Sequence, residues 1–398
     1  MRFPVDEDGV VEFTRELVRI RSVHEPELGN AEAAAAALVA ERMREFGWQP
    51  EVTEVAPGRP NVVAVVEGGG GPGPTLAFEG HTDVVTEGDL AGWTVDPYGA
   101  EIRDGRLYGR GSADMKSGVA AMLHAVRALE QAGPFPGRVM LCVLVDEEGM
   151  MLGAKHFAAS AAAREVAAAI VGEPEEGEIC VAAKGAIRLR VDLAGKMAHG
   201  AMPQHGRNPV AGAGALVGVL GAYERQLHAE FGEHEHLGLP YLTPTVVQGG
   251  SPDQVNVIPA RASLYVDVRT VPVLDHAALV ADVTKLAEAA VSSYGVTAEV
   301  SVVDDRPSVE IAIDDPVVTA LAAAHEAVVG EPARYGGVPG ATDGTILTRD
   351  GGIPTVVYGP GGKWIAHQAD EYVEVADIIR CAHVYAEAAD RFLRGSAA

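Results

Sequence analysis

The stretch PTLAFEGHTDVV, residues 74–85, combines an apolar strand pattern with a histidine and an aspartate near its end. Further apolar runs lie at residues 138–148 (RVMLCVLVDEE) and 167–175 (AAAIVGEPE), and residues 116–132 have a helical pattern. Strands that alternate with helices are typical of a sheet covered by helices on both faces. We therefore expect an α/β fold with a mostly parallel sheet.

The sequence pattern changes at about residue 185. From there to residue 309, strand and helix patterns follow one another in the order βαββαβ, the split-βαβ arrangement of a ferredoxin-like domain. The first pattern then resumes, and 398 residues are in any case too many for one compact core. We expect a discontinuous first domain over residues 1–184 and 310–398, with a second domain over 185–309 inserted into it.

The composition excludes several classes of partner. Acidic residues outnumber basic ones by 56 to 31, and a formal charge of -25 repels phosphate backbones and anionic membranes. No stretch has the apolar length of a signal peptide or a membrane span. Cys142, Cys180 and Cys381 lack the spacing of a metal site and suit a reducing compartment. We expect a cytoplasmic protein that binds neither nucleic acid nor membrane.

Histidines and carboxylates recur where the predicted strands end and where a predicted helix begins. His81 and Asp83 are two residues apart, a spacing that places both side chains on one side of an extended backbone. Asp83 could then hydrogen-bond the far ring nitrogen of His81 and fix its tautomer. The complete set is His81, Asp83, Asp114, Glu147, Glu148, Glu173 and His367.

These side chains are expected to meet, because ligands of an open α/β sheet bind in the crevice beyond the carboxyl ends of its strands. Two imidazoles and three or four carboxylates form a nitrogen and oxygen ligand set suited to Zn²⁺, Mn²⁺ or Co²⁺. The ligands suffice for two ions if one carboxylate bridges them. Two ions about 3.5–4 Å apart activate a shared water and polarise a carbonyl group.

Each of these residues alone also has an ordinary structural explanation. An isolated His-x-Asp is usually a structural pair, a Glu-Glu dipeptide is usually solvated, and Asp114 alone could cap a helix. Their recurrence at successive strand ends favours one common site. Three other patterns indicate no chemistry. The serines Ser112 and Ser117 lie outside a nucleophile elbow, and the glycine run at 68–71 lacks the lysine of a phosphate loop. The histidines of the third pattern lie in a solvated loop, at His228, His234 and His236.

Eight motifs, in their order along the chain, resemble those of one family of metallopeptidases and deacylases. They are GHTDVV (80–85), GRGSADMKSG (109–118), DEEG (146–149), VGEPE (171–175), GKMAHGAMP (195–203), VNVIPA (255–260), DVRT (267–270) and IAHQADEY (365–372). The family includes acetylornithine deacetylase (ArgE), succinyl-diaminopimelate desuccinylase (DapE), aminoacylase and carboxypeptidase G. The resemblance implies a catalytic α/β domain that holds two zinc ions and an inserted lid domain that mediates dimerisation.

The resemblance also implies roles for single residues. The zinc ligands would be His81, Asp114, Glu148, Glu173 and His367, with Asp114 as the bridge. Glu147 would be the general base, which takes a proton from water and delivers it to the leaving amine. Asp83 would orient His81. Because adjacent residues in extended backbone point to opposite sides, Glu148 can reach a metal while Glu147 faces the water.

The inserted domain contributes further residues by resemblance. His199 resembles a lid histidine that reaches the active site of a neighbouring subunit and stabilises the oxyanion, which implies a homodimer. Asn256 and Arg269 resemble residues that bind the substrate carboxylate, a task suited to a planar guanidinium. Thr342 lies in a Gly-Ala-Thr-Asp segment that differs at Ala341 from the common Gly-Gly-Thr form. The ordinary alternatives are a loop histidine for His199 and a strand-end salt bridge for Arg269.

Together the motifs predict a dinuclear zinc hydrolase, with Co²⁺ or Mn²⁺ as substitutes, that cleaves an amide bond in a small carboxylate-bearing substrate. Residues 359–375, GPGGKWIAHQADEYVEV, are most similar to the ArgE/DapE branch of amino-acid metabolism, which favours an N-acyl amino acid deacylase. A carboxypeptidase or dipeptidase of the same family is the alternative. A single-metal hydrolase and an inactive dimeric binding protein are less favoured, since Glu147 and all the expected ligands are present.

Overall fold

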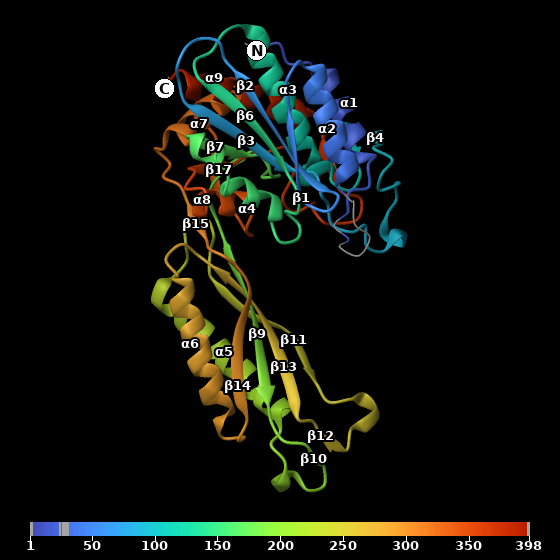
Figure 1. Ribbon diagram of the computed structural model, residues 1–398, viewed down its shortest axis with the longest axis vertical. Helices are drawn as coiled ribbons and strands as arrows, with labels where there is room; N and C mark the ends of the chain where they lie inside the picture. The colour runs from blue at the N-terminus through green and yellow to red at the C-terminus, as the bar shows by residue number, and fades with distance from the viewer. Residues whose placement is uncertain (1–2, 24, 26–31, 396–398) are drawn as a thin grey trace. The chain divides into compact units, whose positions relative to one another are not determined.

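The computed structural model describes residues 3–23, 25 and 32–395 and divides into two compact units (Figure 1). The first unit comprises Met1–Val181, Ile311–Val338 and Thr342–Ala398, and the second comprises Ala182–Glu310 and Pro339–Ala341. Residues 1–2, 24, 26–31 and 396–398 of the expected first domain lie outside the described residues. None of the helices in the described part of the chain has the length and apolar character that a membrane span requires.

The largest sheet has nine strands, most of them in the first unit. They pair in the order β1-β2-β6-β3-β7-β17-β8-β15, and β16 pairs with β8 beside this path. Their bounds are β1 Glu51–Ala56, β2 Arg59–Glu67, β3 Thr75–His81, β6 Arg138–Leu144, β7 Ala168–Val171, β8 Glu178–Ala183, β15 Val309–Glu310, β16 Arg334–Val338 and β17 Thr355–Val357. A small three-stranded sheet consists of β4 (Ile102–Arg103), β5 (Arg106–Tyr108) and β18 (Tyr372–Glu374).

The expectation of a mostly parallel sheet is wrong, because the sheet is mixed. Strands β6, β3, β7 and β17 run parallel at its centre. The pairs β1–β2, β2–β6, β17–β8 and β8–β15 are antiparallel. At one edge the cause is local: only Pro57 and Gly58 separate β1 from β2, and so short a connection can join only antiparallel neighbours.

The sheet separates the helices of the first unit into two layers. On β3, the ring of Phe78 lies 5.2 Å from that of Tyr385 in α9, whereas Glu79 faces Asp343 at the start of α8. Because successive side chains of a strand point to opposite faces, α9 and α8 cover opposite faces. The helices are α1 Glu7–Val18, α2 Ala33–Glu45, α3 Ser117–Ala132, α4 Leu152–Ala158, α7 Pro316–Val329, α8 Asp343–Arg349 and α9 Val375–Leu393.

Three glycines bring the start of α3 against two strand ends. A Cβ added to Gly118 would lie 2.2 Å from the carbonyl oxygen of Gly172, and one added to Gly359 would lie 2.1 Å from the same oxygen. No carbon atom fits at these distances. Gly172 follows β7 and Gly359 lies just beyond β17. The glycines therefore allow close backbone packing at the carboxyl ends of these strands, where the predicted site residues lie.

The second unit is a four-stranded antiparallel sheet with two helices, in the chain order β9, α5, β11, β13, α6, β14. The strands pair in the order β11-β13-β9-β14. Helices α5 and α6 lie along one face of this sheet (Figure 1). The bounds are β9 Gly185–Ala194, β10 Ala198–His199, α5 Pro209–Phe231, β11 Tyr241–Gly249, β12 Val257–Ile258, β13 Arg261–Thr270, α6 His276–Ser292 and β14 Thr297–Arg306, with β10 and β12 forming a separate ribbon.

The replacement Gly118→Ala should lower the free energy of unfolding by about 1–3 kcal/mol, since the new methyl group must displace backbone. The matched control is Gly214→Ala in α5, where an added Cβ has no atom within 4 Å. This control should gain up to about 1 kcal/mol from improved helix propensity. Denaturant unfolding of both variants measures the difference, and equal stabilities would refute the close packing at Gly118.

Candidate metal centre

His81 ends β3 and is fully buried. Its Nδ1 lies 2.9 Å from the backbone carbonyl oxygen of Asp83. A carbonyl oxygen can only accept, so Nδ1 carries a proton and Nε2 is the atom left to bind a ligand. Nε2 lies 3.3 Å from Asp114 Oδ1 and 3.4 Å from Glu173 Oε1, and neither contact has hydrogen-bond geometry. A buried imidazole nitrogen that faces two carboxylate oxygens has the surroundings of a metal ligand.

Asp114 presents its two oxygens to two different histidines. Oδ1 faces His81, and Oδ2 lies 3.2 Å from Nε2 of His367. Two clusters result, one of His81, Asp114 and Glu173 and the other of Asp114, Glu148 and His367, and within each the ligand atoms lie within 4.8 Å of one another. A carboxylate shared in this way has the geometry of a bridging ligand between two cations.

Both histidines carry an excess of negative charge around them. Hydrogen bonding to Asp114 and to Glu148, 3.1 Å away, raises the pKa of His367 to about 10. Burial alone would lower the pKa of His81, but Glu173 and Asp114 outweigh it and raise that pKa well above its usual value. In the metal-free chain protons therefore occupy the histidines, in the place where cations would balance the carboxylates.

The carboxylates respond differently to the same surroundings. Burial would raise the pKa of Asp114, but the two histidines lower it far below its usual range. Burial raises the pKa of Glu148 and raises that of Glu173 to about 8. Burial also raises the pKa of Glu147 strongly, and Glu147 belongs to neither cluster. Glu147 is therefore set apart from the ligand atoms while it shares their buried environment.

Asp83 makes contacts other than the expected one. Nδ1 of His81 bonds to the backbone carbonyl of Asp83, and the nearer carboxylate oxygen is 3.6 Å away. The carboxylate instead accepts hydrogen bonds from the backbone N–H groups of Glu147 and Glu148, at 3.3 and 3.0 Å. Asp83 thus connects the end of β3 to the segment that follows β6.

Glu147 and Glu148 lie in a turn and not in the extended backbone that we expected. Asp146 opens this turn with a φ of 71°. Its carboxylate accepts from the N–H groups of Met150 and Leu152 at 3.0 and 3.2 Å. The different environments of the two glutamates therefore result from a turn held by Asp146, and strand alternation plays no part.

An arginine on the neighbouring strand β2 holds this turn. Arg59 lies 2.6 Å from Asp146 Oδ1 and also pairs with the buried Glu32. Arg59 begins β2, far from the DEEG motif in the sequence. Asp146 opens the DEEG motif, but no motif contains Arg59, and the contact between the two residues depends on how β2 pairs with β6.

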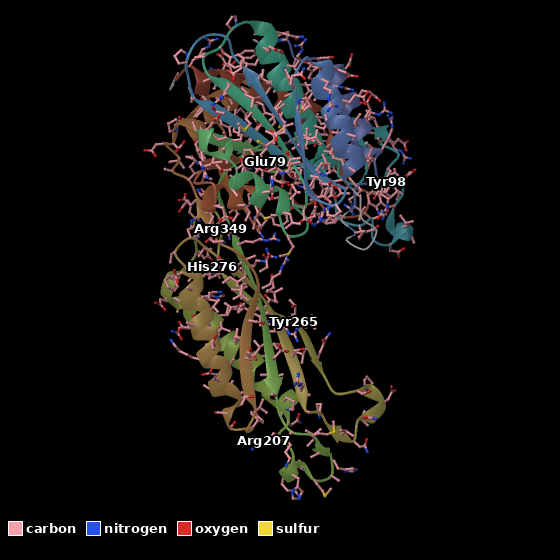
Figure 2. The ribbon with its side chains drawn as sticks, in the orientation of Figure 1. Glu79, Tyr98, Arg207, Tyr265, His276 and Arg349 are labelled. Atoms are coloured by element: carbon pink, nitrogen blue, oxygen red, sulfur yellow. The ribbon has the colours of Figure 1, made fainter. Side chains whose placement is uncertain are left out.

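Two further carboxyl groups lie buried near the clusters. Glu79, labelled in Figure 2, and Asp343 are each 1% exposed. Burial, followed by the charge of Asp343, raises the pKa of Glu79 well above its usual value, so one carboxyl of this pair is protonated. Glu79 is two residues from His81 on β3 and faces the same side of the sheet. A neutral carboxyl here limits the negative charge beside the clusters.

The remaining predicted residues lie partly in the second unit. The ribbon of β10 and β12 pairs His199 with Val257, and Gly200 N–H donates to the Asn256 carbonyl at 2.6 Å, so His199 and Asn256 are neighbours. His199 is exposed. Thr342, in the first unit, is 5% exposed, and its hydroxyl caps α8 by accepting from Gly344 N–H at 3.2 Å.

Arg269 is the penultimate residue of β13 and donates through Nε to Asp267 at 2.8 Å. Lys184 directly precedes β9, whose pairing with β13 places Gly185 opposite Thr270, so Lys184 and Arg269 lie near one another along the sheet. Burial and then the charge of Arg269 lower the pKa of Lys184. No motif singles out Lys184, which only the pairing of β9 with β13 brings near Arg269.

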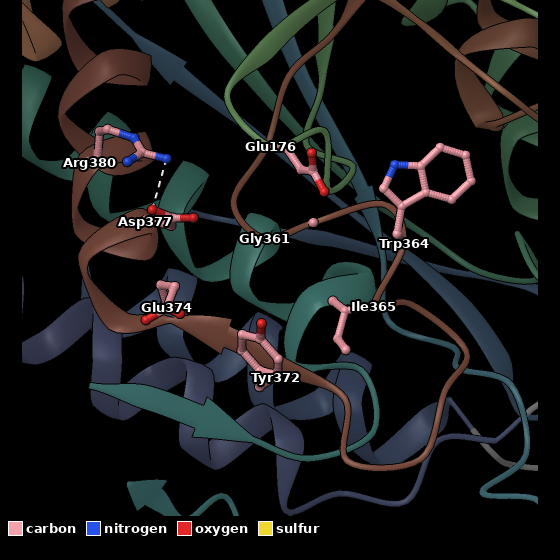
Figure 3. A pocket seen from close by; sticks show the side chains of 9 residues that line it. Glu176, Gly361, Trp364, Ile365, Tyr372, Glu374, Asp377 and Arg380 are labelled. Atoms are coloured by element: carbon pink, nitrogen blue, oxygen red, sulfur yellow. Dashed lines mark ion pairs between the residues drawn. The ribbon is translucent and has the colours of Figure 1, made fainter. Parts of the chain in front are cut away.

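A cavity of about 510 Å³ lies beside the loop that carries His367, but no candidate metal ligand lines it. Figure 3 shows Trp364 and Ile365 of this loop at the cavity, together with Asp377 and Arg380 of α9. The last two form an ion pair with a distance of 2.8 Å. The residues expected to carry out the chemistry therefore do not line this cavity.

Comparison with known proteins gives consistent matches over nearly the whole chain. The sequence profile of peptidase family M20/M25/M40 matches residues 77–391. A succinyl-diaminopimelate desuccinylase of Rhodospirillum centenum is 33% identical over 343 residues, which cover 82% of this chain and 83% of the relative. The second unit and the first are both included in these matches.

Solved structures show the same fold. Aminopeptidase PepT from Bacillus cereus has a TM-score of 0.80 and 22% identity, and the match covers 98% of this chain and 99% of that one. A dinuclear metal binding peptidase of the M20 family from Bacillus subtilis has a TM-score of 0.73 and 19% identity, with coverage of 97% and 98%.

Metal binding at about pH 7 should release protons. The pKa of His367 is raised to about 10 and that of Glu173 to about 8, so both groups are protonated in the metal-free chain and must lose their protons to bind a cation. Affinity for Zn²⁺ or Co²⁺ should therefore fall as pH falls, by about tenfold per pH unit for each proton released. Calorimetric titration in buffers of different ionisation enthalpy counts the protons. An affinity independent of pH between about 6 and 8 would contradict the ligand set.

Proposed function

The chain belongs to peptidase family M20/M25/M40, and from this we propose that it is a dinuclear metal-dependent hydrolase that removes the acyl group from an N-acyl amino acid. The observation that carries the proposal is the carboxylate of Asp114, whose two oxygens face His81 and His367 in separate clusters. One carboxylate placed between two imidazoles has little purpose in a structural ion pair, because a single histidine would satisfy it. Between two cations it is a natural bridge.

The residues present fit two divalent cations. His81, Asp114 and Glu173 would hold one, and Asp114, Glu148 and His367 the other. Imidazole and carboxylate ligands without thiolates suit zinc and also suit cobalt or manganese. When bound, the two cations supply Lewis acidity for the scissile carbonyl and acidify a water for attack.

Glu147 is the residue best suited to move the proton. It is 9% exposed and lies beside both clusters without belonging to either. Burial raises its pKa, and a cationic surrounding would return it to the carboxylate that a base requires. Glu147 takes one proton from the attacking water as the C–O bond forms. It delivers that proton to the amine nitrogen as the C–N bond breaks, so that an acid and an amine leave.

The second unit supports recognition of a carboxylate-bearing substrate. Arg269 and Lys184 place two cations together, and Asn256 is a neighbour of the exposed His199. We assign the substrate carboxylate to Arg269 together with Asn256 of a neighbouring copy in a homodimer, because Asn256 lies beside His199 at the opposite end of β13 from Arg269. We assign the stabilisation of the oxyanion to His199 of that neighbouring copy. The apolar residue Val255, beside Asn256, is 89% exposed, which supports a contact with another chain.

The choice of deacylase over peptidase rests on the sequence relatives. Relatives at about a third identity over most of the chain carry the name succinyl-diaminopimelate desuccinylase. The aminopeptidase structure and the dinuclear metal binding peptidase structure are each less than a quarter identical and share the fold. We therefore rank N-succinyl and N-acetyl amino acids above dipeptides, and we place the protein in the cytoplasm, where its buried free cysteines would stay reduced.

A substrate panel tests the proposal directly. N-succinyl, N-acetyl and N-formyl amino acids and a set of dipeptides would be offered to the protein reconstituted with zinc, cobalt or manganese. Hydrolysis of an N-acyl amino acid in preference to dipeptides is the expected result. Turnover of dipeptides alone would assign the peptidase activity instead.

The variant Glu147→Gln should lower kcat by about 10²–10⁴-fold while binding the same two metal ions per chain, because the base is lost and the ligands are kept. Elemental analysis and kinetics on one preparation give both values. The control Glu165→Gln changes an exposed glutamate that pairs with Arg138 and should leave both unchanged. Loss of metal from Glu147→Gln would make Glu147 a ligand.

Replacing the substrate carboxylate by a methyl ester should raise KM by about tenfold or more, because a charge-assisted hydrogen bond to Arg269 contributes about 1.5–3 kcal/mol. In Arg269→Met the acid and the ester should be hydrolysed with similar KM values. The control is Arg188→Met, which removes an exposed arginine on the neighbouring strand β9 and should keep the preference for the acid. An Arg269 variant that still discriminates between acid and ester would refute this assignment.

A further inference from the structure

Arg110 and Glu371 form an ion pair in the interior of the first unit. Nη1 of Arg110 lies 2.5 Å from Oε2 of Glu371, and each side chain is 1% exposed. The pairing of β5 with β18 brings the two residues together from distant parts of the sequence. Buried ion pairs contribute little net stability, because desolvation offsets their attraction. Stability alone therefore does not explain why an ion pair is buried at this position.

The second oxygen of Glu371 holds the backbone of the bridging carboxylate residue. Oε1 accepts from the N–H groups of Ala113 and Asp114, at 3.0 and 3.1 Å. The backbone carbonyl of Glu371 also accepts from Gly109 N–H at 2.9 Å. The loop that leads into α3 is thereby fixed at Asp114 itself.

Arg110 makes the complementary contacts. Its Nη2 lies 3.2 Å from the carbonyl oxygen of Thr86 and 3.4 Å from that of His367. His367 has a φ of 66°, a left-handed conformation that a residue other than glycine adopts only when its surroundings hold it. The guanidinium of Arg110 therefore contacts the backbone carbonyl of His367, the residue that has the strained conformation.

The pair thus connects two candidate ligands that lie far apart in the sequence. Glu371 holds the amide of Asp114, Arg110 holds the carbonyl of His367, and the ion pair fixes the distance between the two contacts. Lys116 is also buried nearby, but its Nζ donates to the carbonyl of Ile20 and not to Glu371. Glu371 therefore takes its charge balance from Arg110.

We propose that Arg110 and Glu371 are positioning residues that set the spacing of Asp114 and His367 for metal binding. The proposal rests on the metal-binding part of the proposed function. Neither side chain touches substrate or metal in this account. Both act through backbone hydrogen bonds on the residues that do, as partners behind metal ligands commonly do.

The variant Glu371→Gln is a sharp test, because both oxygens of Glu371 act as acceptors. One accepts from two backbone N–H groups and the other from the guanidinium. The NH₂ group of glutamine must then face a donor on one side or the other. Glu371→Gln should weaken the binding of at least one Co²⁺ ion by about 10–100-fold and alter the visible spectrum of the dicobalt protein.

The control is Asp304→Asn in the second unit. Asp304 also belongs to a buried ion pair, with Arg306 at 2.8 Å, and it changes from carboxylate to amide in the same way. Cobalt titration by calorimetry, cobalt spectra and the thermal midpoint of the metal-free protein would be measured for both. Asp304→Asn should keep the affinities and the spectrum of the unaltered protein, even if its midpoint falls as far as that of Glu371→Gln.

A second variant keeps the test sound if Glu371→Gln does not fold. Arg110→Lys keeps the positive charge, but one ammonium group cannot serve both Glu371 and the His367 carbonyl as a planar guanidinium does. It should show the same loss of cobalt affinity. Unaltered affinity and spectrum in a folded variant would overturn the proposal, and so would a failure of both variants to fold, because the pair would then hold the fold itself.

The outcome also separates this proposal from the proposed function. If the unaltered protein binds two cobalt ions but hydrolyses no substrate of the panel, the proposed function fails and the positioning role is still measured. If it hydrolyses N-acyl amino acids while Glu371→Gln binds cobalt normally, only the positioning role fails.

Discussion

The first unit is organised around the compensation of negative charge in a small buried space. Asp114, Glu148 and Glu173 meet there with two imidazoles, and Glu147 lies beside them. Carboxylates that are buried close together, away from water and without enough positive charge beside them, cannot all remain ionised. The raised pKa values of His367 and Glu173 are the metal-free form of that compensation. A cluster that holds extra protons in this way is prepared to exchange them for cations.

Such a cluster needs firm support, because most of its members do not lie on strands. Among the described residues of the two clusters, only His81 belongs to the central sheet; Asp114 lies in a short distorted helical segment, Ser112–Lys116, and the others lie outside helices and strands. The support comes from buried polar side chains that bond to backbone groups: Asp83 to the turn of Glu147, and Glu371 to the loop of Asp114. The glycine contact at Gly118 adds close backbone packing. The fold thus places charged groups behind the clusters to hold them in position.

The sequence predicted the parts of this arrangement that depend on local pattern. An apolar run followed by His81, or by Glu147 and Glu148, indicates both a strand and a polar group at its end. It did not predict strand direction, because β2 and β8 flank the parallel centre as antiparallel neighbours, which no alternation of helix and strand reveals. It also predicted no role for Arg59 or for Glu371, although Glu371 lies within the motif IAHQADEY, because both roles arise from strand pairing between distant segments. Residue types at the site are visible in a sequence, but the contacts that hold them in place are not.

The two clusters differ in how they are held, and this difference explains where the supporting residues are needed. His81 is fully buried on a central strand, and a backbone carbonyl two residues away sets its tautomer. His367 lies in a loop, its side chain is 52% exposed, and its backbone is left-handed. The sheet alone orients the first histidine, whereas the second needs a contact from outside its own loop. The guanidinium of Arg110 provides that contact at the carbonyl of His367. Because Glu371 joins Arg110 to Asp114, the backbone of His367 is connected to the ligand that both clusters share.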